Sequence, residues 1–137
     1  MLSLDTNVLA CYLLGDDVEQ QKQANILISN NDCFVLMTVI IELAWVLKSQ
    51  KINKAIIIQK LIELSRLTNI HLENIEVFKN AMRWEITGMD IADAIHLALS
   101  QSYKNLPMTT FNIAFIKKSQ ALDEVATCQN VSKLINK

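Results

Sequence analysis

The stretch LSLDTNVL at residues 2–9 decides the fold, because a short apolar run ends on the carboxylate Asp5 and a helical pattern begins just after it. We interpret residues 1–4 as a buried strand and residues 7–14 as a helix. Open α/β sheets bind ligands beyond the carboxyl ends of their strands. This strand is therefore expected to present Asp5 at the functional edge of a sheet.

The same alternation of strand and helix continues along the chain. Further strands are expected at 33–37, 70–72, 106–110 and 124–127, and further helices at 16–30, 39–50, 53–67, 74–86, 90–103 and 112–119. The expected N-cap residues are Asp16 or Asp17, Thr38, Asn53, Asp90 and Asn112. Near-continuous apolar strands that alternate with helices are typical of a parallel sheet covered on both faces. The predicted fold class is α/β, a three-layer α/β/α arrangement around a central, mostly parallel sheet of four to five strands.

Length and composition favour one ordinary domain over residues 1–137. Half of the residues are apolar and the formal net charge is -1, so there is no overall basic signature for nucleic acid. The central stretch does contain several cations, which we interpret as a solvated helix face: Lys48, Lys51, Lys54, Lys60 and Arg66. With only two glycines, the chain contains no glycine-rich phosphate loop.

The three cysteines, Cys11, Cys33 and Cys128, are widely spaced and form no CxxC pair. Neither a disulfide framework nor a cysteine zinc site is indicated. The first residues show no basic stretch followed by an apolar one, and the apolar runs stop well short of a membrane span. We expect a cytoplasmic protein without a membrane partner.

Three carboxylates, Asp5, Glu42 and Asp93, stand among aliphatic residues. No Lys or Arg lies within five positions of Asp5, and the nearest to the other two are Lys48 and Arg83. Because a buried, unpaired carboxylate costs several kcal/mol or more, such groups are normally paired, neutralised or bound to a metal. The pattern predicts a shared external cation, and carboxylate oxygens suit Mg²⁺ or Mn²⁺.

Four segments in this order resemble the PIN-domain ribonucleases, specifically the small VapC-like toxins of type II toxin–antitoxin pairs. The segments are LDTNVL, TVIIELAWVL, DIADAIHLAL and TTFN, and the resemblance covers almost the whole chain.

The resemblance implies a PIN-like fold and a Mg²⁺- or Mn²⁺-dependent endoribonuclease acting on an RNA substrate. The family's first three acids fall on Asp5, Glu42 and Asp93, which are the expected metal ligands. Asp90 is an additional acid, and the fourth position, usually Asp, is here Asn112, whose amide oxygen can still bind a hard cation. The resemblance also implies a cognate antitoxin and a homodimer, for which we expect the helices at 39–47 and 54–64 to expose enough aliphatic surface.

Other functional side chains are expected around these acids. Thr6 and Thr110 are candidate hydroxyls that orient Asp5 and a bound phosphate or water. His96 shares a helical face with Asp93, and we interpret it as a hydrogen-bonded residue that supports the site or the core. The aromatic residues could stack on RNA bases, but we expect each of them to lie in the core. They are Trp45, Trp84, Phe111 and Phe115.

Each acid also has a structural interpretation. Asp90 and Asn112 are N-cap candidates, Asp93 fits the second arm of a capping box, and Asp5 can satisfy a tight turn. For Glu42 the one structural interpretation is a salt bridge with a Lys or Arg that is distant in sequence.

Two other functions remain open. One is a PIN-like module that binds RNA or protein with weak catalysis, which Asn112 favours. The other is phosphoaspartate chemistry at Asp5, which the chain supports poorly because it lacks a DxDxT pattern.

Overall fold

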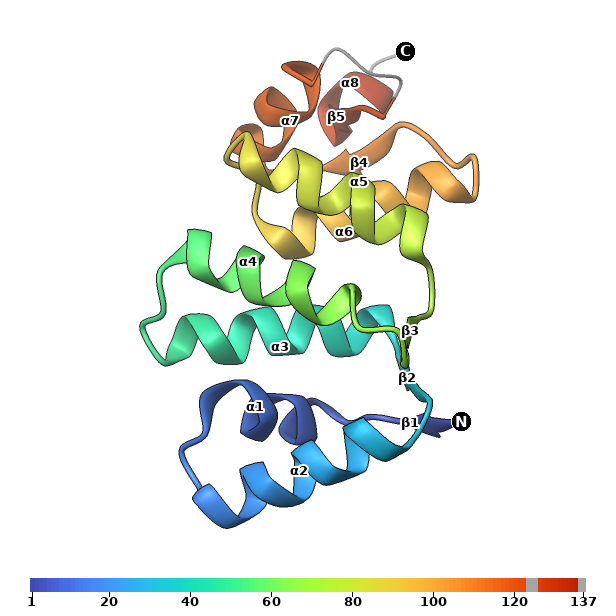
Figure 1. The fold of residues 1–137 in the computed structure, drawn as a ribbon. Helices are drawn as coiled ribbons and strands as arrows, with labels where there is room; N and C mark the ends of the chain where they lie inside the picture. Colours follow the sequence, from blue (N-terminus) through green and yellow to red (C-terminus); the bar gives the residue numbers. More distant parts are fainter. Residues whose placement is uncertain (123–125, 136–137) are drawn as a thin grey trace. The chain divides into compact units, whose positions relative to one another are not determined.

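The computed structural model describes residues 1–122 and 126–135, which form two compact units, Met1–Ile75 and Glu76–Lys137. Each unit is an α/β arrangement in which every strand pair is parallel. Strands alternate with helices throughout the described residues (Figure 1). The predicted α/β class is confirmed, with the strands divided into one sheet of three and one of two.

Unit 1 contains a three-stranded sheet in the order β1-β2-β3 and two helical hairpins (Figure 1). The strands are β1 (Leu2–Ser3), β2 (Cys33–Val35) and β3 (Ile70–Leu72), with Leu2 opposite Cys33 and Cys33 opposite Ile70. The helices are α1 (Thr6–Leu14), α2 (Val18–Asn30), α3 (Met37–Ser49) and α4 (Lys54–Ser65). Helix α1 packs against both α2 and α3, so β1 leads directly into a helix held by two neighbours.

Unit 2 contains the two-stranded sheet. Its strands β4 (Met108–Thr110) and β5 (Cys128–Asn130) pair with Met108 opposite Cys128. The helices are α5 (Ile75–Ile86), α6 (Ile91–Ser102), α7 (Ile113–Gln120) and α8 (Val131–Ile135). Residues 124 and 125 of the expected strand at 124–127 lie outside the described residues, and the observed strand begins only at Cys128.

Local capping chemistry explains where most helices begin. The side chains of Asp17, Asn53, Asp90 and Asn112 each accept a hydrogen bond from the first turn of the helix that follows, as predicted. Thr38 is a wrong prediction, because α3 already begins at Met37 and Leu36 is its cap residue. The Met37 N–H instead donates to Glu73 Oε1 at 2.8 Å, and Glu73 follows β3.

The helices at 39–47 and 54–64 are more deeply packed than their apolar sequences suggested. On α3 and α4 the buried side chains include Val39, Ile40, Leu43, Leu47, Ile57, Ile58, Leu61 and Leu64. Ile56 is 46% exposed, whereas its neighbours Ile57 and Ile58 are buried. The expected surplus of exposed aliphatic surface on these two helices is therefore wrong. Among the described residues, no helix is long and apolar enough to cross a bilayer.

Candidate functional site

Asp5 and Glu42 meet at the N-terminus of α1 through one threonine. Asp5 follows β1 and is the N-cap of α1, where its Oδ1 accepts a hydrogen bond from the Thr6 N–H at 2.8 Å. Glu42 lies in the second turn of α3, and its Oε2 accepts from the Thr6 hydroxyl at 3.3 Å. Two carboxylates from different elements are thus held by the backbone and the side chain of the same residue.

Thr6 itself is buried, whereas both carboxylates are exposed. The sequence-based expectation that Asp5 and Glu42 sit in buried, apolar surroundings is therefore wrong. Their aliphatic neighbours in sequence point into the core, and the carboxylates point out. The burial cost that predicted an external cation does not apply to this pair. What remains is the proximity of two negative charges to a helix N-terminus, whose partial positive charge stabilises anions.

The Thr6 hydroxyl was expected to orient Asp5, but in the structure it bonds to Glu42 instead. The hydroxyl holds Glu42, and the backbone N–H of Thr6 holds Asp5. The cap uses Oδ1 of Asp5, so Oδ2 is not committed to it. A carboxylate oriented through one oxygen retains ligand capacity at the other.

Asp90 and Asp93 meet at the N-terminus of α6 in unit 2. Asp90 is the N-cap, and its Oδ1 accepts from the N–H groups of Ala92 at 2.9 Å and of Asp93 at 3.3 Å. Asp93 lies in the first turn and is half-buried. Burial raises the pKa of the Asp93 carboxyl, and the charge of Asp90 raises it further.

Two basic side chains oppose that shift. The charges of His96 and Lys118 lower the Asp93 pKa, though not enough to outweigh burial. Lys118 comes from α7 and donates from Nζ to the carbonyl of Gly88 at 2.7 Å. Sequence reasoning missed this residue, because the nearest cation in sequence is Arg83 and nothing in the sequence distinguishes Lys118 from Lys117.

His96 does not fulfil its expected role. It lies one turn after Asp93 on α6 but is exposed, and no hydrogen bond links its ring to another of the described residues. The expectation of a hydrogen-bonded histidine that supports the core is wrong. Its contribution to the site is electrostatic, through Asp93.

Asn112 and Thr110 follow β4 and bond locally. Asn112 caps α7, with its Oδ1 accepting from the Phe115 N–H at 3.1 Å. The Asn112 N–H donates to the Thr110 hydroxyl oxygen at 3.0 Å. The amide oxygen that was expected to bind a cation is thus already an acceptor for the helix.

The four aromatic residues divide into two groups. Trp84 and Phe115 are buried, as expected for core residues. Trp45 is 70% exposed and Phe111 is 75% exposed, so a core position is wrong for both. Trp45 lies three residues after Glu42 on α3, and Phe111 directly precedes Asn112.

The structure therefore collects the predicted site residues in two groups, Asp5, Thr6 and Glu42 in unit 1, and Asp90, Asp93, Thr110 and Asn112 in unit 2. Within residues 1–122 and 126–135, neither unit by itself brings three His, Cys, Asp or Glu side chains together as a metal cage. Both groups consist of hard oxygen donors, which suit Mg²⁺ or Mn²⁺.

Comparisons with known proteins place the chain in a family. The family profile described as the PIN domain matches residues 2–120. The comparison with curated proteins finds no significant match. Among solved structures, a toxin-antitoxin complex from Klebsiella pneumoniae is similar at 14% identity, covering 94% of this chain and 96% of that one. The TM-score of this match is 0.34. On the profile match, which spans most of its length, the chain belongs to the PIN-domain family.

Proposed function

We propose that the chain is a metal-dependent endoribonuclease that hydrolyses RNA phosphodiester bonds. Membership of the PIN-domain family, whose members are typically nucleases, supports the reaction class. The observation that carries the proposal is the contact of Thr6 with both Asp5 and Glu42 at the carboxyl end of β1. Parallel sheets place ligand sites at that end of their strands.

Asp5, Glu42 and Asp93 are the proposed metal ligands, with Asp90 and Asn112 as auxiliary residues. A dication bound there supplies Lewis acidity toward the phosphate and lowers the pKa of a water. The chain's own residues prepare this site: Thr6 fixes Glu42, and Asp90 holds the first turn of α6 where Asp93 lies. A dication would also offset the burial and the Asp90 charge that disfavour ionised Asp93.

We treat residues 1–137 as one domain. The family profile matches residues 2–120, a range that includes residues of both units. This coverage supports treating residues 1–137 as one domain.

The direct test is incubation of the purified chain with a single-stranded RNA. We expect internal cleavage with Mn²⁺ or Mg²⁺ and none in excess EDTA. Cleavage that survives EDTA would rule out a metal-dependent reaction.

The substitution Asn112→Asp restores the acid that the family usually has at its fourth acidic position. Asp and Asn cap helices equally well, so α7 should keep its stability. The added charge should strengthen Mn²⁺ binding and raise cleavage at limiting Mn²⁺ by roughly fivefold, the scale of one charge-assisted contact. Metal titrations of cleavage by both proteins check this, and Asn53→Asp, at the α4 cap, is the matched control. An unchanged metal dependence would show that residue 112 serves only as a cap.

We further propose that the protein acts in the cytoplasm as the toxin of a toxin–antitoxin pair and binds a cognate antitoxin. The VapC-like order of the four sequence segments supports this proposal. A short neighbouring gene with a DNA-binding N-terminus and an amphipathic C-terminus would strengthen it.

The homodimer remains a proposal, and α3 and α4 expose less apolar surface to support it than the sequence suggested. Exposed Trp45 on α3 and Ile56 on α4 are the large apolar side chains that these helices leave in solvent. We expect sedimentation at micromolar concentration to give twice the mass of 15.5 kDa. Trp45→Glu should shift the protein toward the monomer if this face forms the interface. A wild-type monomer under these conditions would contradict the proposal.

One observation favours a second function, a PIN-like module that binds RNA or protein with weak catalysis. Asn112 replaces an acid, and its amide oxygen is already used in the α7 cap. Tight RNA binding without cleavage in Mn²⁺ would support this alternative.

A further inference from the structure

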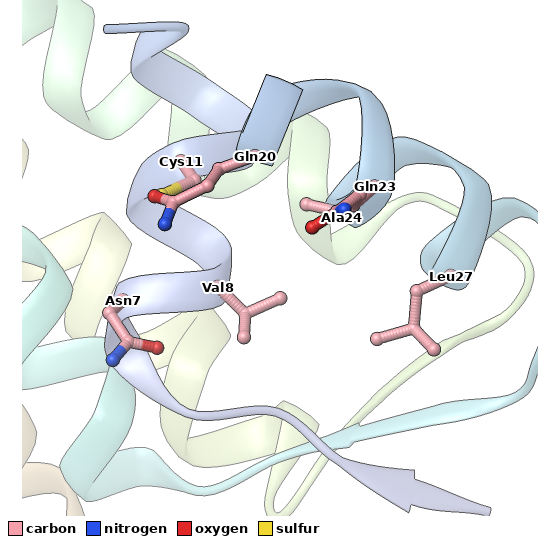
Figure 2. A pocket seen from close by; sticks show the side chains of 7 residues that line it. All are labelled: Asn7, Val8, Cys11, Gln20, Gln23, Ala24 and Leu27. Atoms are coloured by element: carbon pink, nitrogen blue, oxygen red, sulfur yellow. The ribbon is translucent and has the colours of Figure 1, made fainter. Parts of the chain in front are cut away.

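The hairpin of α1 and α2 contains a cavity of about 440 Å³ that lies wholly within unit 1 (Figure 2). Its lining residues are Asn7, Val8, Cys11, Gln20, Gln23, Ala24 and Leu27. Cavities of this size lie within the range that holds small ligands. Neither the acids of the proposed metal site nor their hydrogen-bonding partner Thr6 line it.

The lining is polar but uncharged. Three carboxamides, those of Asn7, Gln20 and Gln23, share the cavity with aliphatic side chains. In Figure 2 the Gln20 carboxamide lies beside Cys11, and Val8 and Leu27 stand across the open space from one another. Without a cation the cavity has no group to neutralise a phosphate or carboxylate, so it favours a neutral ligand with an apolar face and hydrogen-bonding edges.

The three carboxamides retain donor and acceptor groups that make no hydrogen bond within the described part of the protein. Gln20 Oε1 accepts from the Cys11 thiol at 3.3 Å, which leaves the Gln20 NH₂ group available. Within the described part of the chain, the side chains of Asn7 and Gln23 make no hydrogen bond. Asn and Gln amides present a donor and an acceptor side by side, the pattern that pairs with the edge of a nucleobase.

The cavity begins close to Asp5. Asn7 and Val8 lie in the first turn of α1, whose N-cap is Asp5. At about 1.5 Å of rise per residue, Asn7 stands within one turn of that carboxylate along the helix axis. A nucleotide whose base occupies the cavity would therefore keep its backbone near the Asp5 and Glu42 pair.

We propose that this cavity binds one unstacked nucleobase of the RNA substrate, next to the phosphate that is cleaved. This inference rests on the proposed ribonuclease function and adds to it a site for base recognition. Sequence-specific proteins commonly read single-stranded RNA through splayed-out bases. Val8 and Leu27 contact the apolar face of the base, and the carboxamides bond to its edge.

Cys11 provides a reporter for this site. It is partly exposed at the cavity, whereas Cys33 and Cys128 are buried. Burial raises the pKa of both buried thiols, which lowers their thiolate fraction. Alkylation by iodoacetamide should therefore be fastest at Cys11, and the Cys11→Ser variant should lack this fast phase.

The experiment measures Cys11 alkylation, by mass spectrometry, in EDTA with each of the four nucleoside 5′-monophosphates. At a Kd on the order of 1 mM, a reasonable value for a ligand of this size, about 10 mM nucleotide slows alkylation roughly tenfold. Ribose 5-phosphate, which lacks the base, should give no protection. Gln23→Met should weaken protection by about fivefold, the scale of one hydrogen bond. Gln59→Met, an exposed position on α4 outside the cavity, should not.

Equal protection by ribose 5-phosphate, or no protection by any of the four nucleotides, would overturn the proposal. Protection by N-acetyl-leucinamide alone would also overturn it and would indicate a protein side chain as the occupant. Because EDTA prevents metal binding, the result does not depend on cleavage. If the protein binds the base but does not cleave RNA, the base-binding proposal is supported and the ribonuclease proposal is contradicted.

Discussion

Replacing Glu42 with Gln, or Asp5 with Asn, is expected to reduce Mn²⁺-dependent RNA cleavage by roughly 100-fold or more. Loss of a residue that merely supports a metal ligand typically costs about 10- to 100-fold in affinity or activity, and loss of a ligand should cost at least as much. Both side chains keep their shape, so the Thr6 hydroxyl can still donate to the amide oxygen in the Glu42→Gln variant. The measurement is the initial rate of cleavage at fixed Mn²⁺.

Stability separates a catalytic effect from a folding effect. Asn caps helices as well as Asp, so Asp5→Asn should leave the Tm nearly unchanged. Glu19→Gln, an exposed position in the first turn of α2, is the matched control for Glu42→Gln and should cleave like the wild type. Near-normal cleavage by Glu42→Gln would remove Glu42 from the site.

Asp93→Asn is expected to abolish cleavage and at the same time to stabilise the protein in EDTA. The ionised Asp93 carboxylate is disfavoured by burial and by Asp90, and the charges of His96 and Lys118 compensate only in part. Asn resembles the neutral acid and escapes this penalty. Because Asp93 is only half-buried, we expect a gain of about 0.5 kcal/mol at neutral pH, the scale of partly screened charge interactions.

The pH dependence of that gain has a defined sign. The folded-state pKa of Asp93 is raised above the unfolded value of about 3.9, so the folded state binds the proton more tightly. The stability that Asp93 contributes is fully present below pH ~3.9 and is lost as pH rises through the folded pKa. The advantage of Asp93→Asn should therefore grow over this interval and stay constant above it.

Urea unfolding in EDTA at several pH values measures this effect. Asp16→Asn, at an exposed position before α2, is the matched control and should leave the free energy of unfolding at neutral pH nearly unchanged. An Asp93→Asn variant that is less stable than wild type at neutral pH would contradict the argument.

Helix starts were predictable because their causes are local. Asp17, Asn53, Asp90 and Asn112 each bond to an N–H two or three residues away, and a short window of sequence contains both partners. Thr38 failed as a cap because Glu73, distant in sequence, takes the first N–H of α3. No local pattern contains that contact.

The sequence identified the residues of the candidate site, but it did not predict their solvent exposure or the charges near them. Apolar neighbours in sequence suggested that Glu42 is buried, but on a helix adjacent residues point in different directions. Ile41 and Leu43 turn toward the protein while Glu42 remains exposed. The same limit applies to Lys118, whose influence on Asp93 depends on packing within unit 2 and leaves no signal in sequence spacing.

The central claim is that Asp5, Glu42 and Asp93 are ligands of a hard dication, and Mn²⁺ binding tests this claim without RNA. The electron paramagnetic resonance signal of free Mn²⁺ can be titrated against the wild type, Glu42→Gln and Asp93→Asn. We predict saturable binding by the wild type and at least about tenfold weaker binding by each variant. Binding by Asp93→Asn that equals the wild type, or no saturable binding by the wild type, would contradict the claim.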